Sequence, residues 1–288
     1  MPRAIIQLGD QRIAIDVPDL LWEDIKISFG NHLQDASSEP LSKQVLVTSD
    51  RDNFFTVADA HGSSEGVPRA DVTSLVMDAV ITALIEDVSS SIVLHAGAVA
   101  LQTNAAVIVG PTGAGKSSLV AWLVDRGFQY LTDEIVLASD DTAISGFSRA
   151  LVMKPGSYEF VRRLPNLAGA KVIPAGSNHL VRPPSPDQAH GLRCALLLFV
   201  KFSAGSDLEL RLGSRAGVAS ALVEANLNAR NFADGGFVSL TALARRIPGI
   251  FLTYGHFDQL ADRLGPLLRK SLEKQYAPES YGKLFASL

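Results

Sequence analysis

Short segments that alternate apolar and polar residues fill the first part of the chain, up to about residue 60. Turn-forming clusters, such as Gly9-Asp10 and the HGSS stretch at 61–64, stand between or after them. Alternation with a period of two predicts half-buried strands, and such clusters predict turns. We therefore expect a small, mostly antiparallel sheet. Its strands are expected at Ala4–Leu8, Arg12–Val17, Gln44–Thr48 and Phe54–Ala58.

The pattern changes to helical spacing over residues 69–88. Apolar residues recur there every three or four positions, among them Val72 and Val76, which is the period of one buried helix face. We expect this helix to connect two domains. The small β-rich domain would comprise residues 1–90 and the larger domain residues 91–288.

From Ser91 onward, strand-like segments alternate with helical patterns, which predicts a mixed α/β fold. The stretch 169–191 contains four prolines and a Gly-Ser-Asn turn signal, which predicts a long loop. Pro266 predicts a kink or a break in the last helix. Strands are expected at Ile92–Leu94, Gly97–Leu101, Ala105–Val109, Phe128–Leu131, Ile135–Ala138, Ala195–Phe202, Leu208–Leu212 and Ile250–Tyr254. Helices are expected at Lys116–Arg126, Ala216–Ala229, Ser239–Arg246 and Phe257–Lys274.

An apolar strand runs directly into a glycine-rich loop at residues 110–117, GPTGAGKS. This stretch matches the phosphate-loop pattern GxxxxGK[ST], in which glycines allow a tight turn and backbone N–H groups surround phosphate oxygens. Lys116 would reach the terminal phosphates, and the Ser117 hydroxyl would bind Mg²⁺. The sequence therefore predicts a nucleoside triphosphate site. Its expected residues are Gly110, Pro111, Thr112, Gly113, Ala114, Gly115, Lys116, Ser117 and Ser118.

Two adjacent acids, Asp133 and Glu134, follow the next predicted strand, 17 and 18 residues after Lys116. A helix of about three turns and a short strand would bring them back beside the phosphates. Two carboxylates at that place can divide the work, because one can accept the proton of an attacking hydroxyl while the other holds the metal ion. A solvated strand end is the alternative that involves no function.

Composition and charge exclude several classes of protein. The net charge of −4 argues against a general nucleic-acid binder, which would need a basic face, so no nucleic-acid partner is expected although local basic patches remain possible. The longest apolar runs, such as Ala195–Val200, are much shorter than a membrane span, and the N-terminus lacks the apolar core of a signal peptide. We therefore expect a cytoplasmic protein without a membrane partner. The single cysteine, Cys194, lies in an apolar run and is expected to be a core residue rather than a nucleophile.

Four features occur in a fixed order along the chain: a histidine-bearing strand with His95, the phosphate loop, Arg126-Gly127, and Asp133-Glu134. In this order they resemble the catalytic domain of the HPr kinase/phosphorylase family and its HprK-related kinases. That domain is itself similar to the nucleotide-binding part of phosphoenolpyruvate carboxykinase. The resemblance implies a P-loop kinase core of this type, with ATP or alternatively GTP and Mg²⁺ as cofactors. It also implies self-association as a homo-oligomer, since HPr kinases are hexameric.

The resemblance covers residues 90–160 well and is carried there by LHAGAVAL and VIVGPTGAGKSSLVAWLVDRGFQYLTDEIVL. It extends more weakly to the end of the chain. The weaker segments are Lys154–Ser157, Glu224–Arg230 and Leu252–Gly255.

The resemblance also implies roles for individual residues. Asp133 would be the base that activates the acceptor hydroxyl. Glu134, where the family usually has a second aspartate, would help Ser117 to hold Mg²⁺. The longer glutamate side chain could make that contact through water.

The resemblance also implies catalytic roles for three further residues. A lone histidine such as His95 in an apolar strand is usually a core residue, but the resemblance implies that it lies near the transferred phosphoryl group. Arg149 and Lys154 flank an apolar stretch and would neutralise phosphate charge, with a solvated strand edge as the alternative. Arg230, on the same predicted helix as two asparagines, is a weaker candidate for contact with acceptor or nucleotide.

Two departures from the family's pattern bear on the acceptor. Residues 1–90 do not resemble the regulatory domain of the bifunctional enzymes, and SGFSRALVMKPGS replaces the glycine-rich acidic stretch after the paired acids. The layout is more similar to HprK-related kinases of peptide-tailoring clusters, including those of lasso peptides. It implies transfer of the γ-phosphoryl group of ATP to a serine-type hydroxyl of a peptide or small protein. The alternatives are a small-metabolite kinase on the same core, and a nucleotide-gated binding module in which ATP orders residues 169–191.

Overall fold

The computed structural model describes residues 1–35, 41–50, 53–184, 191–274 and 281. The described residues form two compact units, and the chain passes between them five times. The first unit comprises Met1–Val88, Ser148–Glu159 and Gly169–Pro183, and the second comprises Ser89–Phe147, Phe160–Ala168 and the chain from Pro184 onward. The division into a small domain at residues 1–90 and a larger domain at residues 91–288 stays a prediction.

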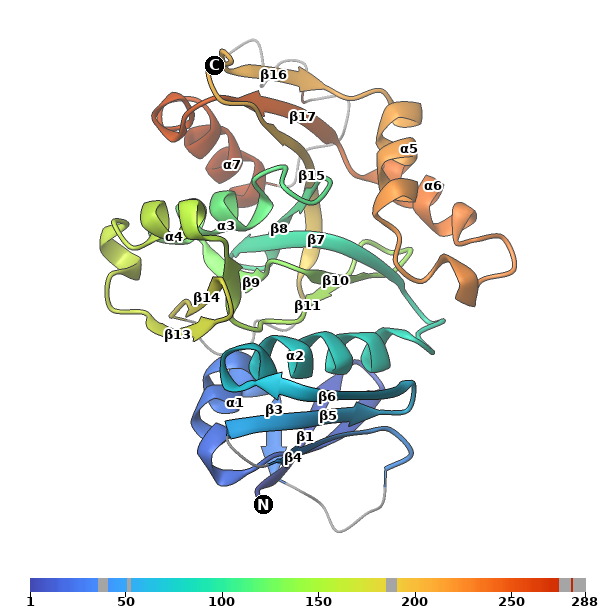
Figure 1. The fold of residues 1–288 in the computed structure, drawn as a ribbon. Coiled ribbons are helices and arrows are strands. Elements are labelled where there is room, and N and C mark those ends of the chain that lie inside the picture. The colour runs from blue at the N-terminus through green and yellow to red at the C-terminus, as the bar shows by residue number, and fades with distance from the viewer. Residues whose placement is uncertain (36–40, 51–52, 185–190, 275–280, 282–288) are drawn as a thin grey trace. The chain divides into compact units, whose positions relative to one another are not determined.

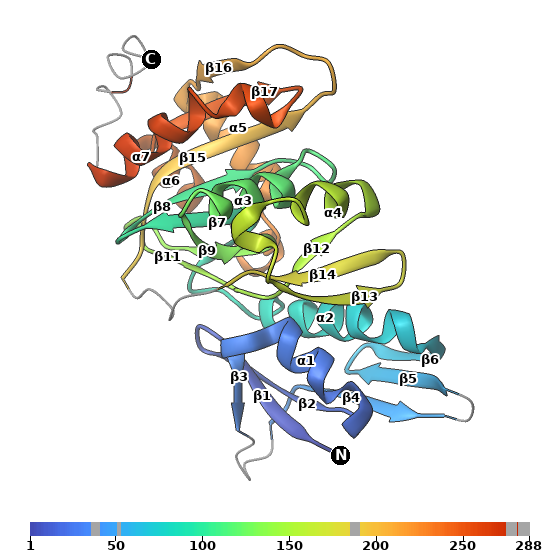
Figure 2. The same cartoon turned by 90° about the vertical axis from the view of Figure 1, so that its left-hand side faces the viewer.

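The first unit is built on a six-stranded sheet. Its strands are β1 (Arg3–Leu8), β2 (Gln11–Asp16), β3 (Leu33–Asp35), β4 (Gln44–Ser49), β5 (Phe54–Asp59) and β6 (Gly62–Pro68). The order is β3-β1-β2-β4-β5-β6, and every neighbouring pair is antiparallel except β2 and β4. The expected small, mostly antiparallel sheet is therefore confirmed. Helix α2 (Arg69–Ile85) packs on β2 and β5 of this sheet, and α1 (Trp22–Phe29) packs against α2 (Figure 2).

A second, three-stranded sheet in the first unit corrects the long loop expected at 169–191. It has the order β12-β14-β13, formed by β12 (Leu151–Met153), β13 (Lys171–Ala175) and β14 (Asn178–Arg182). Gly176 makes the turn of the β13–β14 hairpin with φ = 58°, and its N–H donates to the carbonyl oxygen of Ala70 at 2.8 Å. Residues 185–190 of the expected loop lie outside the described residues.

The second unit contains a mixed sheet in the order β11-β10-β7-β8-β15-β17-β16, with β9 also paired to β7. Strands β8, β15 and β17 are mutually parallel, and the other pairs are antiparallel. The mixed α/β class expected from the sequence is confirmed. The strands are β7 (Ile92–Leu101), β8 (Asn104–Val109), β9 (Gln129–Thr132), β10 (Ile135–Ala138), β11 (Ile144–Gly146), β15 (Arg193–Phe202), β16 (Glu209–Leu212) and β17 (Gly249–Tyr254).

Helices cover both faces of this sheet. Helices α3 (Lys116–Asp125) and α7 (Leu264–Glu273) pack on one face, and α5 (Arg215–Ala225) and α6 (Phe237–Arg246) lie on the other (Figure 1). The core under α5 and α6 includes Val109, Phe199 and Leu222. Cys194 lies in the same core with 2% of its surface exposed, which confirms its expected place. Among the described helices, none has the length and apolar composition needed to cross a membrane.

Several expected elements differ in their bounds. Two expected strands are one continuous β7, and the expected last helix is divided into the 3₁₀ helix η6 (Phe257–Leu260) and α7. The helix expected at 216–229 ends at Ala225, so Arg230 lies in a separate 3₁₀ helix, η5 (Ala229–Asn231).

The sequence patterns did not predict some short elements. These are α1, β3, β6, β11, β12, α4 (Pro155–Val161), and the 3₁₀ helices η1 (Asp19–Leu21), η2 (Gly30–His32) and η4 (Pro165–Leu167).

Candidate functional site

The glycine-rich loop joins the end of β8 to the first residue of α3, as the sequence predicts. Gly113 and Gly115 have φ values of 86° and 93°, in the left-handed region that glycine tolerates best. A Cβ atom on Gly115 would lie 2.7 Å from the hydroxyl oxygen of Tyr254, whereas one on Gly113 would meet nothing within 4 Å. Gly115 is therefore required by its conformation and by its close packing, and Gly113 by its conformation alone.

Backbone hydrogen bonds hold the loop against the neighbouring strand. The N–H of Phe202, at the end of β15, donates to the carbonyl oxygen of Ala114 at 2.9 Å, and the N–H of Ala114 donates to the carbonyl oxygen of Pro111 at 3.1 Å. Pro111 and Thr112 are exposed. The first N–H groups of α3 lack partners within the helix, so this end of the helix is suited to an anion.

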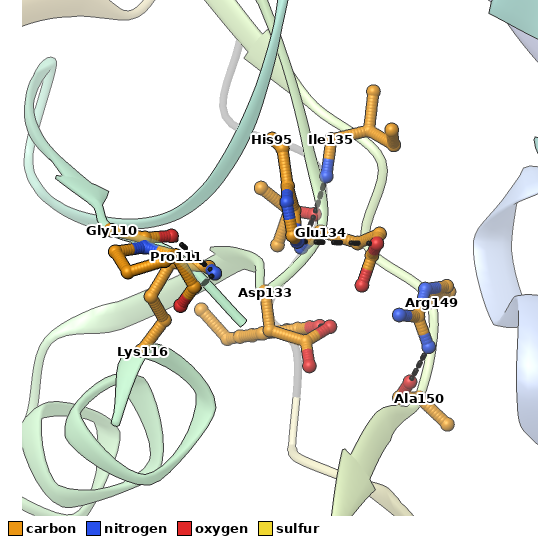
Figure 3. Close-up of polar contacts among 11 residues, drawn as sticks. His95, Gly110, Pro111, Lys116, Asp133, Glu134, Ile135, Arg149 and Ala150 are labelled. Carbon is orange, nitrogen blue, oxygen red and sulfur yellow. Dashed lines mark hydrogen bonds and ion pairs between the residues drawn. The ribbon is translucent and has the colours of Figure 1, made fainter. Parts of the chain in front are cut away.

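The ammonium of Lys116 is bonded to its own loop. Its Nζ donates to the carbonyl oxygens of Gly110 at 2.7 Å and Pro111 at 3.3 Å (Figure 3). Lys116 is only 6% exposed. Burial lowers the pKa of Lys116, and the negative charges of Glu134 and Asp133 oppose that shift. The two acids therefore act electrostatically on the lysine that the loop supplies.

The two acids lie in the turn between β9 and β10, which is shaped by the Thr132 side chain. Its Oγ1 accepts hydrogen bonds from the N–H groups of Glu134 and Ile135, both at 3.2 Å. The carbonyl oxygen of Glu134 accepts from the N–H of Ala96 on β7 at 3.1 Å. This turn therefore fixes the backbone that carries both acids beside β7.

The two carboxylates differ in their access to solvent. Asp133 is 2% exposed, and the Tyr130 hydroxyl donates to its Oδ1 at 3.4 Å. The Glu134 side chain is 33% exposed, and its Oε1 lies 3.4 Å from Nε2 of His95, whose side chain is 26% exposed. Strand β7 pairs with β10, and His95 lies directly opposite Ile135, the residue after Glu134. This pairing brings the side chains of His95 and Glu134 together (Figure 3).

The residues expected to hold Mg²⁺ have suitable chemistry. Ser117 lies in the first turn of α3, directly after Lys116, and supplies a hydroxyl, while Glu134 supplies a carboxylate. Mg²⁺ prefers oxygen ligands and is usually held by one or two side chains together with phosphates and water. No cluster of three or more His, Cys, Asp or Glu suited to a metal occurs in the part of the chain that the structure describes. The donor set therefore fits a cation that is shared with bound phosphates.

Arg149 and Lys154 belong to the first unit, unlike the phosphate loop. Arg149 is 3% exposed and donates from Nη1 to the carbonyl oxygen of Ala150 at 2.9 Å. Lys154 is exposed, and it precedes α4. Their role beside the phosphates stays a prediction.

The asparagine-containing segment after α5 has a structural role. Asn228 is 1% exposed; its Oδ1 accepts from the N–H of Val93 at 2.8 Å, and its Nδ2 donates to the carbonyl oxygen of Ser91 at 3.0 Å. This segment therefore fastens the end of α5 to the start of β7. Arg230 is exposed.

Sequence reasoning missed a cavity of about 510 Å³ beside the loop. Its lining comes from β7, β8, β15, β16, β17 and α5 and includes His95, Gly110 and Pro111. No motif marks it, because its walls come from segments that are distant in the sequence. The only local signal is the set of charged residues at the ends of otherwise apolar strands, such as Lys201 and Glu209.

Comparisons with known proteins give a structural similarity. No family model matches the chain, and no curated protein matches it. Among solved structures, the Hpr(Ser) kinase/phosphatase from Coxiella burnetii matches with 17% sequence identity, covering 63% of this chain and 87% of that one, at a TM-score of 0.26.

Proposed function

We propose that this protein is an ATP-dependent kinase that transfers the γ-phosphoryl group to a hydroxyl. One observation carries the proposal: Lys116, in a glycine-rich loop at the N-terminus of α3, lies in one site with the adjacent acids Asp133 and Glu134 (Figure 3). A phosphate loop binds a triphosphate, and adjacent carboxylates add what transfer to a hydroxyl requires, a base and a metal ligand. Nucleotide binding alone would not need a base.

The chain's own residues divide the work as follows. Loop N–H groups and Lys116 bind and orient the triphosphate, and Lys116 leaves the carbonyl oxygens of Gly110 and Pro111 to do so. Ser117 and Glu134 would hold Mg²⁺, which neutralises charge on the phosphates when it is bound. Asp133 accepts the proton of the acceptor hydroxyl while the acceptor oxygen bonds to the γ-phosphorus. The bond from that phosphorus to the β,γ-bridging oxygen breaks, and ADP leaves.

His95 acts through its neighbour in this proposal. Its Nε2 lies 3.4 Å from Glu134, close enough to hold that carboxylate in place. A contact of this kind limits the rotamers of Glu134 and so supports its contact with the metal ion. His95 also lines the cavity beside the loop, which puts it near an acceptor that enters there.

The acceptor expected from the sequence is a serine-type hydroxyl of a peptide or small protein, and a precursor of a lasso peptide or another ribosomal peptide is its narrowest form. A small-metabolite acceptor is the second candidate. The cavity of about 510 Å³ favours it, because pockets of roughly 300–1,000 Å³ typically enclose small molecules.

Mass spectrometry of reactions with Mg²⁺-ATP tests the kinase proposal. Candidate peptides and hydroxylated metabolites are incubated with the wild type, Asp133→Asn and Glu134→Gln. A gain of one phosphoryl group is expected with the wild type. Loss of a general base typically costs 10²–10⁴-fold in rate, so Asp133→Asn should lose transfer and retain ATP binding, whereas Glu134→Gln should regain part of its activity at high Mg²⁺. Full transfer by Asp133→Asn would refute the assignment of the base.

A further inference from the structure

The cavity beside the loop has an ordered floor that follows from the strand register. Phe199 on β15 is paired with Val109 on β8 and with Phe251 on β17, and Phe251 is paired with Arg211 on β16. These four residues form one row across the sheet, and all four line the cavity. The rings of Phe199 and Phe251 stack at 4.8 Å, and the guanidinium of Arg211 lies 4.9 Å from the centre of the Phe251 ring. The floor is therefore apolar and ends in a cation.

A second row of lining residues lies nearer the carboxyl ends of the parallel strands. Lys201 is paired with Thr253, and Thr253 is paired with Glu209. Lys201, Thr253 and Glu209 each lie two positions along the same strand from a residue of the first row. Because side chains alternate between the two faces of a strand, residues two positions apart lie on the same face. This row offers an ammonium, a hydroxyl and a carboxylate. In open α/β sheets, ligands bind at this end of the strands.

Helix α5 supplies the opposite wall. Ala221, Glu224 and Ala225 line the cavity, and their spacing of three and four residues puts them on one helix face. The two alanines leave room above the aromatic floor, and Glu224 adds a second carboxylate. With Lys201, Arg211 and Glu209, the lining therefore holds two cations and two carboxylates.

The cavity opens at the end of the loop where the terminal phosphate belongs. Gly110 and Pro111 line it, and their carbonyl oxygens accept the hydrogen bonds of the Lys116 ammonium. In a phosphate loop this lysine reaches the β- and γ-phosphates. A molecule in the cavity would therefore face the γ-phosphoryl group rather than the nucleoside.

We propose that this cavity is the acceptor site and that the acceptor is a small zwitterionic hydroxy compound, of the class of hydroxylated amino acids. This inference rests on the proposed kinase function. The lining has equal numbers of positive and negative side chains, which favours an acceptor that carries both charges. An acceptor with only anionic groups would be repelled by Glu209 and Glu224, and one with only cationic groups would be repelled by Lys201 and Arg211. The acceptor hydroxyl lies toward Gly110 and His95, because His95 contacts Glu134 and so marks the end of the cavity nearest the proposed base Asp133, which does not itself line the cavity. A peptide acceptor is the competing outcome.

The test uses the full chain with Mg²⁺-ATP and measures ADP formation and phosphorylated product. The probes are L-serine, L-threonine and L-homoserine, with N-acetyl-L-serine and L-serinamide as analogues that carry a single charge. At least one zwitterion should raise ADP formation tenfold or more above the rate without acceptor. Both analogues of L-serine should be at least tenfold poorer than L-serine itself. Equal activity of either analogue would overturn the charge assignment.

A matched pair of substitutions on α5 locates the site. Ala221→Phe fills the cavity, whereas Ser220→Phe adds the same side chain at an exposed neighbour that does not line it. Ala221→Phe should raise the KM for the zwitterion tenfold or more while the Kd for ATP stays within twofold of wild type, and Ser220→Phe should leave both unchanged. Arg211→Gln is a second, milder variant, also expected to raise that KM, in case the large side chain prevents folding.

The possible outcomes separate this inference from the kinase proposal. Phosphorylation of a peptide at an unchanged rate by Ala221→Phe would overturn the cavity as the acceptor site and leave the kinase proposal standing. ATP binding without phosphorylation of any peptide or metabolite would overturn both. Zwitterion turnover that is lost in Ala221→Phe and retained in Ser220→Phe would support both.

Discussion

The Nζ of Lys116 lies 2.7 Å from the carbonyl oxygen of Gly110, the residue that opens the loop to which the lysine belongs. The loop thus supplies the lysine with an internal acceptor, and a bound phosphate would replace it. The exchange is favourable because a phosphate oxygen carries a formal negative charge, whereas the carbonyl oxygen of Gly110 carries only a partial one. Desolvation lowers the pKa of Lys116, so an incoming anion also restores favourable surroundings for its charge.

Lys116→Met should therefore weaken ATP binding strongly. A hydrogen bond to a charged group contributes about 1.5–3 kcal/mol, so the Kd for ATP should rise by about 10–150-fold, as measured by isothermal titration calorimetry. Lys270→Met removes an exposed lysine on α7 and should leave the Kd within twofold. Equal Kd values for Lys116→Met and wild type would contradict the assignment of the loop as a phosphate site.

The two left-handed glycines of the loop should respond differently to alanine. Gly113→Ala introduces backbone strain of about 1–2 kcal/mol in the free energy of unfolding. Gly115→Ala should cost more, because its Cβ would lie 2.7 Å from the Tyr254 hydroxyl oxygen and 3.1 Å from Cβ of Phe202. Thermal unfolding without nucleotide measures both. An equal loss of stability in the two variants would show that the contact with Tyr254 relaxes at no cost.

Asn228→Ala should destabilise the protein without a direct effect on phosphoryl transfer. It leaves the buried N–H of Val93 and the carbonyl oxygen of Ser91 without the partners that Asn228 supplies, at a cost of about 1–3 kcal/mol. Arg230→Ala, two residues away and exposed, should change the free energy of unfolding by less than about 0.5 kcal/mol. Urea denaturation measures both variants. Loss of phosphoryl transfer in a stable Arg230→Ala would instead support the contact that the sequence suggests for this arginine.

The first unit should lose stability in mild acid because of His32. Its Nε2 accepts from the N–H of Ser148 at 2.8 Å, and its Nδ1 lies 3.3 Å from the carbonyl oxygen of Gln7. Burial, with a smaller contribution from Arg182, lowers the pKa of His32 from 6.5 to about 4. Between these values the unfolded chain binds the extra proton, so stability is greatest above pH 6.5 and is lost as the pH falls toward 4.

The expected loss is up to about 3 kcal/mol over that interval. Trp22 lies in the first unit and Trp122 in the second, so Trp22 fluorescence in a Trp122→Phe background reports on the first unit alone. Urea denaturation at pH 7.5 and pH 5 should show a smaller pH dependence for His32→Gln than for the unsubstituted residue. Parallel pH dependences would mean that other groups control acid stability.

Cys194 should be unreactive in the folded protein. It is 2% exposed, and burial raises the pKa of its thiol to about 12, which lowers the thiolate fraction near pH 8 by about 10³-fold relative to an ordinary cysteine. Reaction with a chromogenic disulfide reagent should be complete in denaturant and negligible in buffer over the same time. Rapid reaction in buffer would show that this part of the core opens readily.

Local sequence predicted the elements whose form depends on neighbouring residues. The GPTGAGKS loop, the strand before it and α3 after it are of this kind, because glycine positions and helix periodicity act over a few residues. The β13–β14 hairpin was missed because Pro174 argues against a strand. Proline is tolerated there because β13 is the edge of its sheet, and edge position depends on the fold as a whole.

The parts of the site that depend on strand order could not be derived from spacing. His95 meets Glu134 because β7 pairs with β10, and only the resemblance to a known family had joined these residues. The row of Phe199, Phe251 and Arg211 arises from the register of three strands that are far apart in sequence. Nothing in the local pattern of any one strand specifies that register.

The five passages of the chain between the units limit how the protein can be dissected. A fragment beginning at residue 89 would still contain Ser148–Glu159 and Gly169–Pro183, whose neighbours in the first unit include His32 and Ala70. In such a fragment these segments would lack their partners in the first unit. A fragment ending at residue 88 would lack the segments themselves. A truncation or gene fusion at residue 88 would therefore divide the first unit, although all segments of the second unit would stay on one fragment.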